Sequence, residues 1–355
     1  MRTPTQPGVL DQRLRVIDPL SHSEWDSLVA ANPKSSFFHT SDWARVLQET
    51  YGHRPVYCCR YANGQITDLL PVMEVTSPLL GRRGVSLPFT DFCNPLVSSD
   101  FGAGSLYGAA MEYGRQRGWR TFELRHNESI RPASAKSVSY WGHTLNLSCG
   151  PDVLFRKLKS SLRCGVRKAE RAGLRVEFGV DAKSMRMFFK LHCLTRQRHG
   201  MPCQSLKFFE NIVRFMLAKG HGFIATAWHG QSPVAAAMFF HQGEEAFYKF
   251  GASDYAYQRL RPNNLLMWQS IRKCCVDGFS KLHFGRTSLH QQGLRRFKLG
   301  FGAQEEKLEY FKYDYRKEAY VSGIDRSESP IRHVLRFLPL PLLRIGGRLV
   351  YPDLA

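Results

Sequence analysis

The order of hydrophobic and polar positions predicts a mixture of helices and strands in the first half of the chain. Apolar residues recur at helical spacing in three segments, and Ser or Thr residues stand near the starts of the first two. Alternation with a period of two on both sides of Asn63-Gly64 predicts a hairpin with a two-residue turn. The predicted elements are helices over 21–33 and 40–52, the hairpin over 54–75, a strand and a Gly- and Pro-rich loop over 81–97, a helix over 106–119 and a strand over 120–126.

The second half repeats this mixture. Its predicted elements are a helix over 151–173, a strand over 174–179, helices over 181–200 and 205–220, strands over 222–230, 232–242 and 245–253, a helix over 263–278, a strand over 281–285, a short helix over 293–301 and a strand over 306–315. The similar order predicts a duplicated α/β domain, although no repeat is visible residue by residue. We expect a flexible arm over 1–12, a first domain over 13–148, a second over 149–322 and a C-terminal tail over 323–355.

The tail differs from both halves. Residues 329–351 are apolar and basic, contain no acidic residue, and include prolines that exclude one long helix. Such a segment fits the surface of an anionic membrane. It equally fits a role in packing across the groove between the two domains.

Composition and charge indicate the number of domains, the kind of partner and the cellular compartment to expect. The 355 residues suit two domains, and 50 Lys and Arg against 30 Asp and Glu give a formal charge of +20, which favours anionic partners such as nucleic acid, phosphorylated metabolites or anionic lipid. The nine cysteines form no CxxC or Cys/His ligand spacing, so we expect no metal site and a reducing compartment. No signal-peptide pattern or long apolar run stands out, and the chain reads as cytoplasmic.

The stretch "HFGRTSLHQQGLRRFKLGFGAQ", residues 283–304, combines glycines and cations at the end of a predicted strand. Gly285 permits close backbone approach, and Arg286 and Lys298 could hold a phosphate or carboxylate, or stabilise an oxyanion at an attacked carbonyl. The alternative is a surface turn, with Phe297 and Phe301 in the core and the cations in solvent. From the pattern alone both interpretations stand.

Two further segments are candidate anion sites. In 250–268, an aromatic strand and a polar loop precede a helix that opens at Pro262, and its free N–H groups would favour a pyrophosphate beside Arg261, Asn263 and Asn264. In 154–171, a row of basic residues lies beside an apolar helical face. The cations expected to contact substrate there are Arg163, Arg167 and Lys168. The alternatives are a capped helix with a buried face and a solvated amphipathic helix.

Several of these stretches together resemble the FemAB-like (FemABX-type) acyltransferases, whose halves each have the GNAT acyltransferase fold. They span about residues 35–312 in the family's order: "FFHTSDWARVLQETYG", "LLPVMEV", "GRRGVSLPFTDFCNP", "RCGVRKAERAGLRVEFG", "FFKLHCLTRQRHGMPCQSLKFF", "LRPNNLLMWQSI" and "FGRTSLHQQGLRRFKLGFGA". The resemblance implies two tandem GNAT-like domains and transfer of an acyl or aminoacyl group to a primary amine. The donor would be acyl-CoA or aminoacyl-tRNA, with no metal and no tightly bound cofactor.

The resemblance also implies roles for particular residues. The family's catalytic lysine falls on Lys298 of Phe297-Lys298, and a cation that follows a tryptophan and grips substrate phosphate falls near Arg45, after Trp43. Many relatives have Asp where this chain has His283. The base that takes the ammonium proton is left open among Asp91, His283 and a substrate phosphate. We also expect Tyr248, on the aromatic strand before the polar loop, to contact substrate.

Three functions follow as hypotheses. The leading one is an acyl- or aminoacyl-transferase that forms an amide on a peptidoglycan or exopolysaccharide precursor, with a nucleotide- or lipid-linked glycan or peptide as acceptor and tRNA as a candidate partner. It would work in the cytoplasm, where the tail could bring it to the inner face of the membrane. The alternatives are an acyl-CoA-dependent N-acetyltransferase of a small amine or amino sugar, and a non-catalytic RNA- or membrane-binding module.

Overall fold

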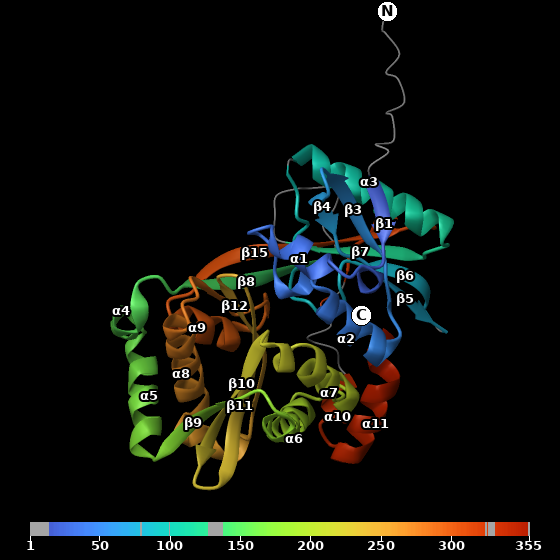
Figure 1. Ribbon diagram of the computed structural model, residues 1–355. Coiled ribbons are helices and arrows are strands. Elements are labelled where there is room, and N and C mark those ends of the chain that lie inside the picture. Colours follow the sequence, from blue (N-terminus) through green and yellow to red (C-terminus); the bar gives the residue numbers. More distant parts are fainter. Residues whose placement is uncertain are drawn as a thin grey trace, which may run out of the picture.

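The computed structural model describes residues 14–78, 80–98, 100–126, 138–323, 325 and 331–353. The expected flexible arm over 1–12 lies outside these residues. Within them the protein has the mixed α/β architecture that the sequence predicts, with helices on both faces of a large sheet (Figure 1).

Within the described residues, the first half supplies a small sheet, part of the large sheet and the α-helices α1, α2 and α3. A small sheet has the order β1-β3-β4, and the remaining strands belong to the large sheet. The elements are β1 (Leu14–Ile17), α1 (Trp25–Ala30), α2 (Ser41–Tyr51), β2 (Arg54–Pro55), β3 (Tyr57–Ala62), β4 (Gln65–Leu70), β5 (Met73–Ser77), β6 (Gly81–Val85), α3 (Asp100–Gln116), β7 (Thr121–His126) and β8 (Val138–Asn146). The hairpin turn has positive φ at Asn63 (52°) and Gly64 (77°), which agrees with the predicted two-residue turn.

The second half begins with a helix that is broken where the sequence predicts a continuous one. The predicted helix over 151–173 is divided at Leu158 and Lys159, where the Lys159 N–H bonds the Gly300 carbonyl at 2.9 Å instead of a carbonyl of its own helix. The elements of this half are α4 (Gly150–Lys157), α5 (Ser160–Arg171), β9 (Leu174–Gly179), α6 (Ala182–Arg198), α7 (Leu206–Phe215), β10 (Gly222–His229), β11 (Ser232–Gln242), β12 (Glu245–Ser253), α8 (Pro262–Val276), β13 (Lys281–His283), β14 (Thr287–Ser288), α9 (Gln292–Gly300), β15 (Gln304–Asp314), β16 (Ala319–Tyr320), α10 (Ile331–Leu335) and α11 (Leu340–Val350).

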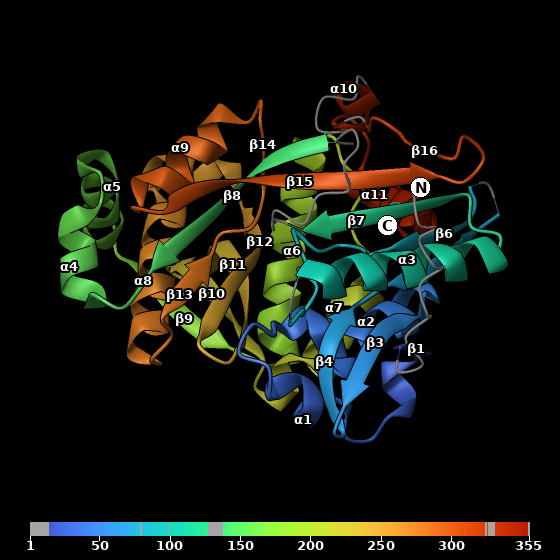
Figure 2. The same cartoon turned by 90° about the horizontal axis from the view of Figure 1, so that it is seen from above.

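The two halves share one sheet. Its order is β2-β5-β6-β7-β15-β8-β13-β12-β11-β10-β9, with β14 beside β8 and β16 beside β15. The long strand β15 pairs with both β7 and β8, and runs across the molecule in the view from above (Figure 2). Since β8 pairs with β13, β14 and β15, the strand before the expected boundary at 148 is built into the second half. The division at 148/149 stays a prediction.

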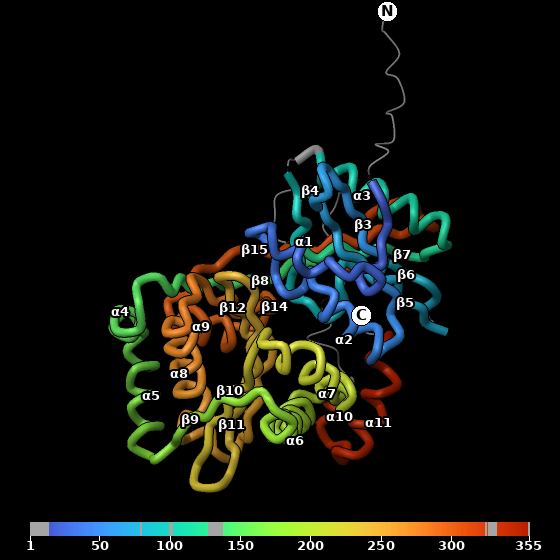
Figure 3. Tube along the Cα trace, in the orientation of Figure 1, coloured from blue at the N-terminus to red at the C-terminus, as the bar shows by residue number. Residues whose placement is uncertain are grey.

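Strand alternation divides the core of the second half between two layers. Along β11, Ala236, Met238 and Phe240 join the core that includes α6 and α7, whereas Ala235, Ala237 and Phe239 join the core beneath α5 and α8. The trace shows α5 and α8 on one side of β10 and β11 and α6 and α7 on the other (Figure 3).

The first of these cores also joins the halves. Phe37 packs against Phe240 with ring centroids 4.8 Å apart, and Trp43 of α2 packs against Phe208 of α7. Both Phe37 and Trp43 are fully buried. The packing of α2 against α7 therefore fixes the position of one half relative to the other. Both halves contribute residues to the cavity described below, so this packing also fixes its walls.

Candidate functional site

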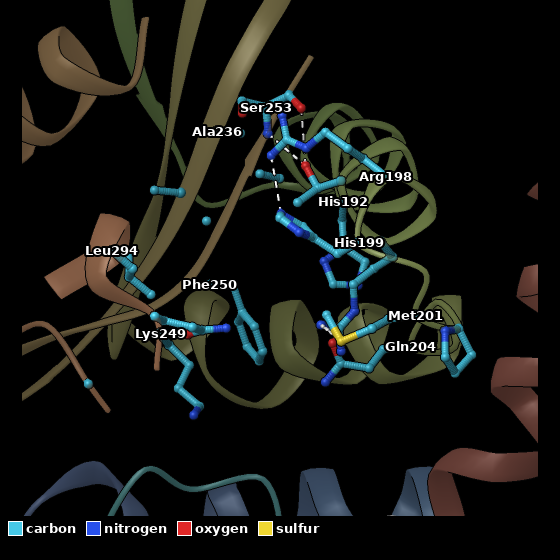
Figure 4. A pocket seen from close by; sticks show the side chains of 18 of the residues that line it. His192, Arg198, His199, Met201, Gln204, Ala236, Lys249, Phe250, Ser253 and Leu294 are labelled. Atoms are coloured by element: carbon cyan, nitrogen blue, oxygen red, sulfur yellow. Dashed lines mark hydrogen bonds between the residues drawn. The ribbon is translucent and has the colours of Figure 1, made fainter. Parts of the chain in front are cut away.

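A cavity opens where two parallel strands separate. β12 and β13 pair in parallel from Glu245 and Lys281 to Phe247 and His283, and there β13 ends while β12 continues to Ser253. The cavity of about 1200 Å³ is lined by β12 from Tyr248 onward, by the turn after β13, and by parts of α6, α9 and the C-terminal helices. Figure 4 shows Lys249 and Leu294 on one side of it and His199, Met201 and Gln204 on the other.

A bulge in β12 sets the direction of Lys249. Opposite β11, the register passes from Phe250 paired with Met238 to Tyr248 paired with Phe239, so Lys249 is the extra residue. A bulge of this kind turns a side chain out of the regular alternation. The Lys249 ammonium donates to the Asp91 carboxylate at 2.9 Å, on the loop that the first half contributes.

Arg286 and Lys298 complete a charged cluster with Asp91 and Lys249. The Arg286 guanidinium lies 4.0 Å from the Asp91 carboxylate, stacks over the Tyr140 ring at 4.5 Å and donates to the Tyr310 hydroxyl. Lys298 is 2% exposed, and its ammonium nitrogen lies 3.0 Å from the carbonyl oxygens of Gly285 and Arg286. All four side chains line the cavity, so the structure brings together Asp91, Arg286 and Lys298 as the sequence predicts.

The surroundings of Lys298 favour its neutral form. Burial lowers the pKa of this amine to about 7; the Asp91 charge opposes the shift, and Lys249 and Arg286 add to it. A neutral amine has two N–H groups and one lone pair. Two carbonyls accept from the nitrogen, so both N–H groups of the neutral form have partners and its lone pair remains for another molecule. The geometry and the electrostatics therefore agree on a lysine that can exchange a proton near neutral pH.

The ion pair of Asp91 and Lys249 shifts the pKa of each partner. Burial alone would raise the pKa of Asp91, but Lys249, Arg286 and Lys298 outweigh it and lower the pKa below its ordinary value. Burial also lowers the pKa of Lys249, and the Asp91 charge opposes that shift. Asp91 is accordingly a poor proton acceptor at neutral pH.

Gly285 lets the chain pass close to Asp91. Its φ is +67°, and a Cβ added there would lie 2.8 Å from the Asp91 carboxylate. We expect Gly285→Ala to cost about 1–3 kcal/mol of stability, because an L-residue is strained at this φ and the carboxylate must shift. Thermal unfolding measures the loss, with Gly293→Ala as the control, since no atom lies within 4 Å of a Cβ there. Equal melting temperatures for the two variants would contradict this explanation.

A second cationic group lies across the cavity. Arg196 and Arg198 of α6, His199 after it and Arg332 of α10 line this end. Burial, together with Arg198, Arg196, Arg332 and Arg336, lowers the pKa of His199 to about 4. Of the described residues that line the cavity, six are Lys or Arg and one, Asp91, is a carboxylate. The cavity therefore suits a ligand with more than one anionic group.

Two buried polar atoms face the same end without a protein partner. His192 and Gln204 are both 4% exposed, both line the cavity, and neither the His192 Nε2 nor the Gln204 Oε1 is hydrogen-bonded. Buried polar atoms are usually satisfied, so these positions fit contacts to a bound molecule.

The other predicted site residues are divided between the cavity and the surface. Tyr248, Phe297 and Asn263 line the cavity, and the Asn263 amide donates to the Ser253 hydroxyl at 3.3 Å. Asn264 instead lies against Gly165 of α5, and Arg261, in the left-handed conformation before α8, is exposed.

The basic helix α5 points its cations away from the cavity. Arg167 and Lys168 are exposed, and Arg163 is half-buried and donates to the Arg156 carbonyl. None of the three lines the cavity among the described residues. They form a separate basic surface.

The predicted residues His283, Trp43 and Arg45 are engaged elsewhere. The His283 ring lies 3.0 Å from the Glu245 carboxylate and 3.1 Å from the Thr144 hydroxyl, and stacks on Phe247. Trp43 is part of the aromatic core, and Arg45 lies over the Phe215 ring at 5.9 Å. None of these three is among the described cavity-lining residues.

Sequence reasoning missed Lys249 and the second cationic group. A single lysine in an aromatic strand carries no signal for a bulge. The segment "TRQRHG" has a visible excess of cations, but only the fold shows that they face the cavity.

The C-terminal segment packs on the protein. The Cys203 N–H bonds the Leu343 carbonyl at 3.2 Å, the Gln197 amide bonds the Leu338 carbonyl at 2.9 Å, and Tyr351 is 4% exposed. Arg83 of the first half donates to the Asp353 carbonyl. The packing interpretation of the tail is thus correct for one face of these helices.

The described part of the chain contains neither a candidate metal site nor a candidate membrane-spanning helix. No group of three or more His, Cys, Asp or Glu side chains there could hold a metal ion. None of its helices combines the length and apolar character that crossing a bilayer requires.

Comparisons with known proteins identify a transferase domain. Residues 156–308 match the acetyltransferase (GNAT) domain family. A search of curated proteins finds no significant match.

Solved structures agree on the fold of most of the chain. A crystal structure of FemX has 13% sequence identity and a TM-score of 0.65, with 83% of this chain and 96% of that chain covered. A tandem GNAT protein from the clavulanic acid biosynthesis pathway has 10% identity and a TM-score of 0.55, with 85% and 98% covered. The Saccharomyces cerevisiae N-myristoyltransferase with bound myristoyl-CoA has 12% identity and a TM-score of 0.52, with 93% and 90% covered.

Together these findings support the tandem GNAT-like fold and an acyltransferase, as the sequence predicts. The resemblance to FemX extends over most of the chain at low identity, so it bears on the fold. Enzymes of the matched class take an acyl donor and an amine acceptor.

Proposed function

We propose that the protein transfers an acyl or aminoacyl group to a primary amine of a cell-envelope precursor of the peptidoglycan or exopolysaccharide type. The observation that carries the proposal is the buried Lys298 amine, at the point where β12 and β13 separate and inside a cavity rich in cations. The FemX-like fold of most of the chain supports this choice of acceptor.

The proposed reaction uses Lys298 as the proton carrier. The acceptor arrives as an ammonium ion, and the neutral Lys298 amine takes one of its protons. The freed amine attacks the carbonyl carbon of the ester or thioester, a C–N bond forms, and the oxyanion is stabilised by the neighbouring cations. When the intermediate collapses, the C–O or C–S bond breaks and Lys298 gives its proton to the leaving group. The attacking nitrogen then loses its second proton through Lys298 to water, which leaves a neutral amide and a neutral Lys298.

The other candidate bases are less suitable. The ion pair with Lys249 holds the Asp91 carboxylate in its charged, weakly basic form. The His283 ring is occupied by Glu245 and Thr144. In this proposal Asp91 keeps Arg286 and Lys249 in position, and His283 supports the strand.

The remaining parts of the proposal concern partners. The second cationic group would hold the phosphates of a nucleotide- or lipid-linked acceptor. The start of α8, with Arg261 and Asn263, would face the donor's pyrophosphate if acyl-CoA is the donor. With aminoacyl-tRNA as donor, Arg167 and Lys168 on α5 would contact its backbone. The reaction would take place in the cytoplasm, at the inner face of the membrane if residues 329–351 contact lipid.

The second candidate function is acyl-CoA-dependent N-acetylation of a small amine or amino sugar. The match of residues 156–308 to an acetyltransferase domain favours it. A cavity of about 1200 Å³ is larger than a small amine requires, which favours the larger acceptor.

Assays with each donor in turn distinguish the two functions. Purified protein is incubated with labelled acetyl-CoA or with charged tRNA, each with amine-bearing envelope precursors and with small amines. Product from charged tRNA or on an envelope precursor supports the leading proposal, and product only on small amines supports the second. No product under any combination, with native mass spectrometry showing no bound donor, would contradict both.

The proposed proton transfer predicts a pH dependence. The pKa of Lys298 is lowered to about 7 and the neutral amine is the active form, so kcat should rise tenfold per pH unit below pH 7 and level off above it. Single-turnover rates between pH 5 and 9 measure this profile. A rate that stays constant from pH 5 to 8 would exclude Lys298 as the base.

A further inference from the structure

The helix α11 presents three different faces. Leu343 and Gly347 are buried against the loop that contains Cys203. Leu342, Ile345 and Leu349, at i, i+3 and i+7, form a second face, which we call the apolar stripe. Their exposed fractions are 52%, 57% and 72%. Since residues at this spacing share one side of a helix, the stripe is continuous and faces solvent.

Cations border this stripe. Arg344 and Arg348 lie one turn apart between the buried face and the stripe, at 100° per residue, and both are exposed. Arg344 also lies over the Phe189 ring at 5.3 Å, which fixes its position. No acidic residue occurs between residues 331 and 350.

The preceding helix continues the same character. In α10 and the turn after it, Val334 and Phe337 are 65% and 87% exposed, and Arg336 between them is exposed. Both helices lie on the outer side of α6 (Figure 1). Large apolar side chains at such exposure are costly in water, and together they need a partner that is apolar and negatively charged.

We propose that the apolar stripe of α11, with Arg348, Phe337 and Arg336, docks the protein on an anionic lipid bilayer. Leu342, Ile345, Leu349 and Phe337 would enter the boundary between headgroups and acyl chains, while the arginines contact lipid phosphates. The charge of the helix pair matches such a surface. A second copy of this chain, which has the same cations on the same face, would meet them with like charge.

The docked helix also borders the cavity. Leu342 and Val350 of α11, and Leu335 and Leu338 before it, line the cavity, and Leu342 and Val350 are exposed as well. Docking would therefore place this rim of the cavity at the bilayer surface. A membrane-resident amphiphile could enter it without crossing the aqueous phase.

Vesicle flotation with the full chain tests the docking. The probes are vesicles of phosphatidylcholine alone and vesicles with 30% phosphatidylserine. We expect the protein to float with the anionic vesicles and to stay with the aqueous fraction in their neutral counterparts. The double variant Ile345→Ser/Leu349→Ser should lower the partition coefficient at least tenfold, and Arg348→Gln should lower it several-fold.

Matched controls separate docking from general charge and hydrophobicity. Val276→Ser removes an apolar side chain that is 75% exposed on α8, and Arg316→Gln removes an exposed cation in a turn; neither should change flotation. Circular dichroism verifies that each variant is folded. Equal flotation by wild type and the stripe variants would overturn the proposal, as would no flotation with anionic vesicles. A dimer in light scattering that the stripe variants abolish, without vesicle binding, would assign the stripe to self-association instead. The readout needs no catalytic activity, so it stands apart from the proposed reaction.

Discussion

Replacing Lys298 with methionine should lower the rate of transfer by about a thousand-fold or more. Methionine keeps the aliphatic stem and removes the amine, so proton transfer and stabilisation of the oxyanion by this residue are both lost. General acid–base catalysis contributes about 10²- to 10⁴-fold, and a single oxyanion-stabilising donor contributes about 10²- to 10³-fold. Single-turnover kinetics with saturating donor and acceptor measure the loss, and the pH-dependent limb of the profile should disappear with it.

A matched substitution makes the result specific. Lys307→Met changes the same residue type at a side chain that is 48% exposed on β15, and it should leave the rate within twofold of wild type. Circular dichroism and binding of the donor should be close to wild type for both variants. If Lys298→Met kept more than a tenth of the wild-type rate, Lys298 would not carry the reaction and the proposed mechanism would be wrong.

Much of the fold was predictable because its elements have strong local signals. The Asn63-Gly64 turn, the helix starts at Thr40 and Ser205 and the alternating strands of the second half are all encoded within a few residues of themselves. The break of the predicted helix at Lys159 was not predictable. It depends on the Gly300 carbonyl, which is far away in sequence, and no local pattern reveals such a contact.

Some residues of the candidate site were likewise predictable from the sequence, and others were not. Lys298, Arg286 and Asp91 stand on glycine- and proline-rich segments, where unusual residues stand out from the pattern. Lys249 comes from a regular-looking strand, and its place in the site depends on a bulge against β11 that only the pairing defines. The cations of α6 line the cavity together with the C-terminal helices, which pack on α6 from a distant part of the sequence.

Asp91 is the counter-ion of the charged cluster in the cavity. Asp91 is the only carboxylate among the described cavity-lining residues, and Lys249, Arg286 and Lys298 surround it. The Asp91 carboxylate therefore favours the charged forms of Lys249 and Arg286 and opposes the lowering of the Lys298 pKa. Without it, Lys249 would be a buried charge with no counter-charge, since its side chain is 6% exposed.

Asp91→Asn should accordingly destabilise the protein by about 2–4 kcal/mol at pH 7, because loss of one partner of a buried pair leaves the other charge uncompensated. Lys249→Met should cost less, since Asp91 keeps Arg286 and Lys298 as neighbours. The double variant should be more stable than the sum of the two losses predicts, by about 1–3 kcal/mol, because removal of both partners leaves no unpaired charge. Urea unfolding of the four proteins measures this coupling free energy.

The pH dependence of the free energy of unfolding gives a second, independent test of the coupling between Asp91 and Lys249. The folded pKa of Asp91 lies below the ordinary value of 3.8, so its contribution to stability is present above that pH and is lost as pH falls through the folded pKa. The difference between wild type and Asp91→Asn should thus persist at pH 7 and shrink below about pH 4. The exposed pair Glu112 and Arg115, at 2.7 Å, is the control, and its coupling should stay below about 1 kcal/mol. Equal coupling energies for the two pairs would mean that Asp91 does not hold the cationic cluster together.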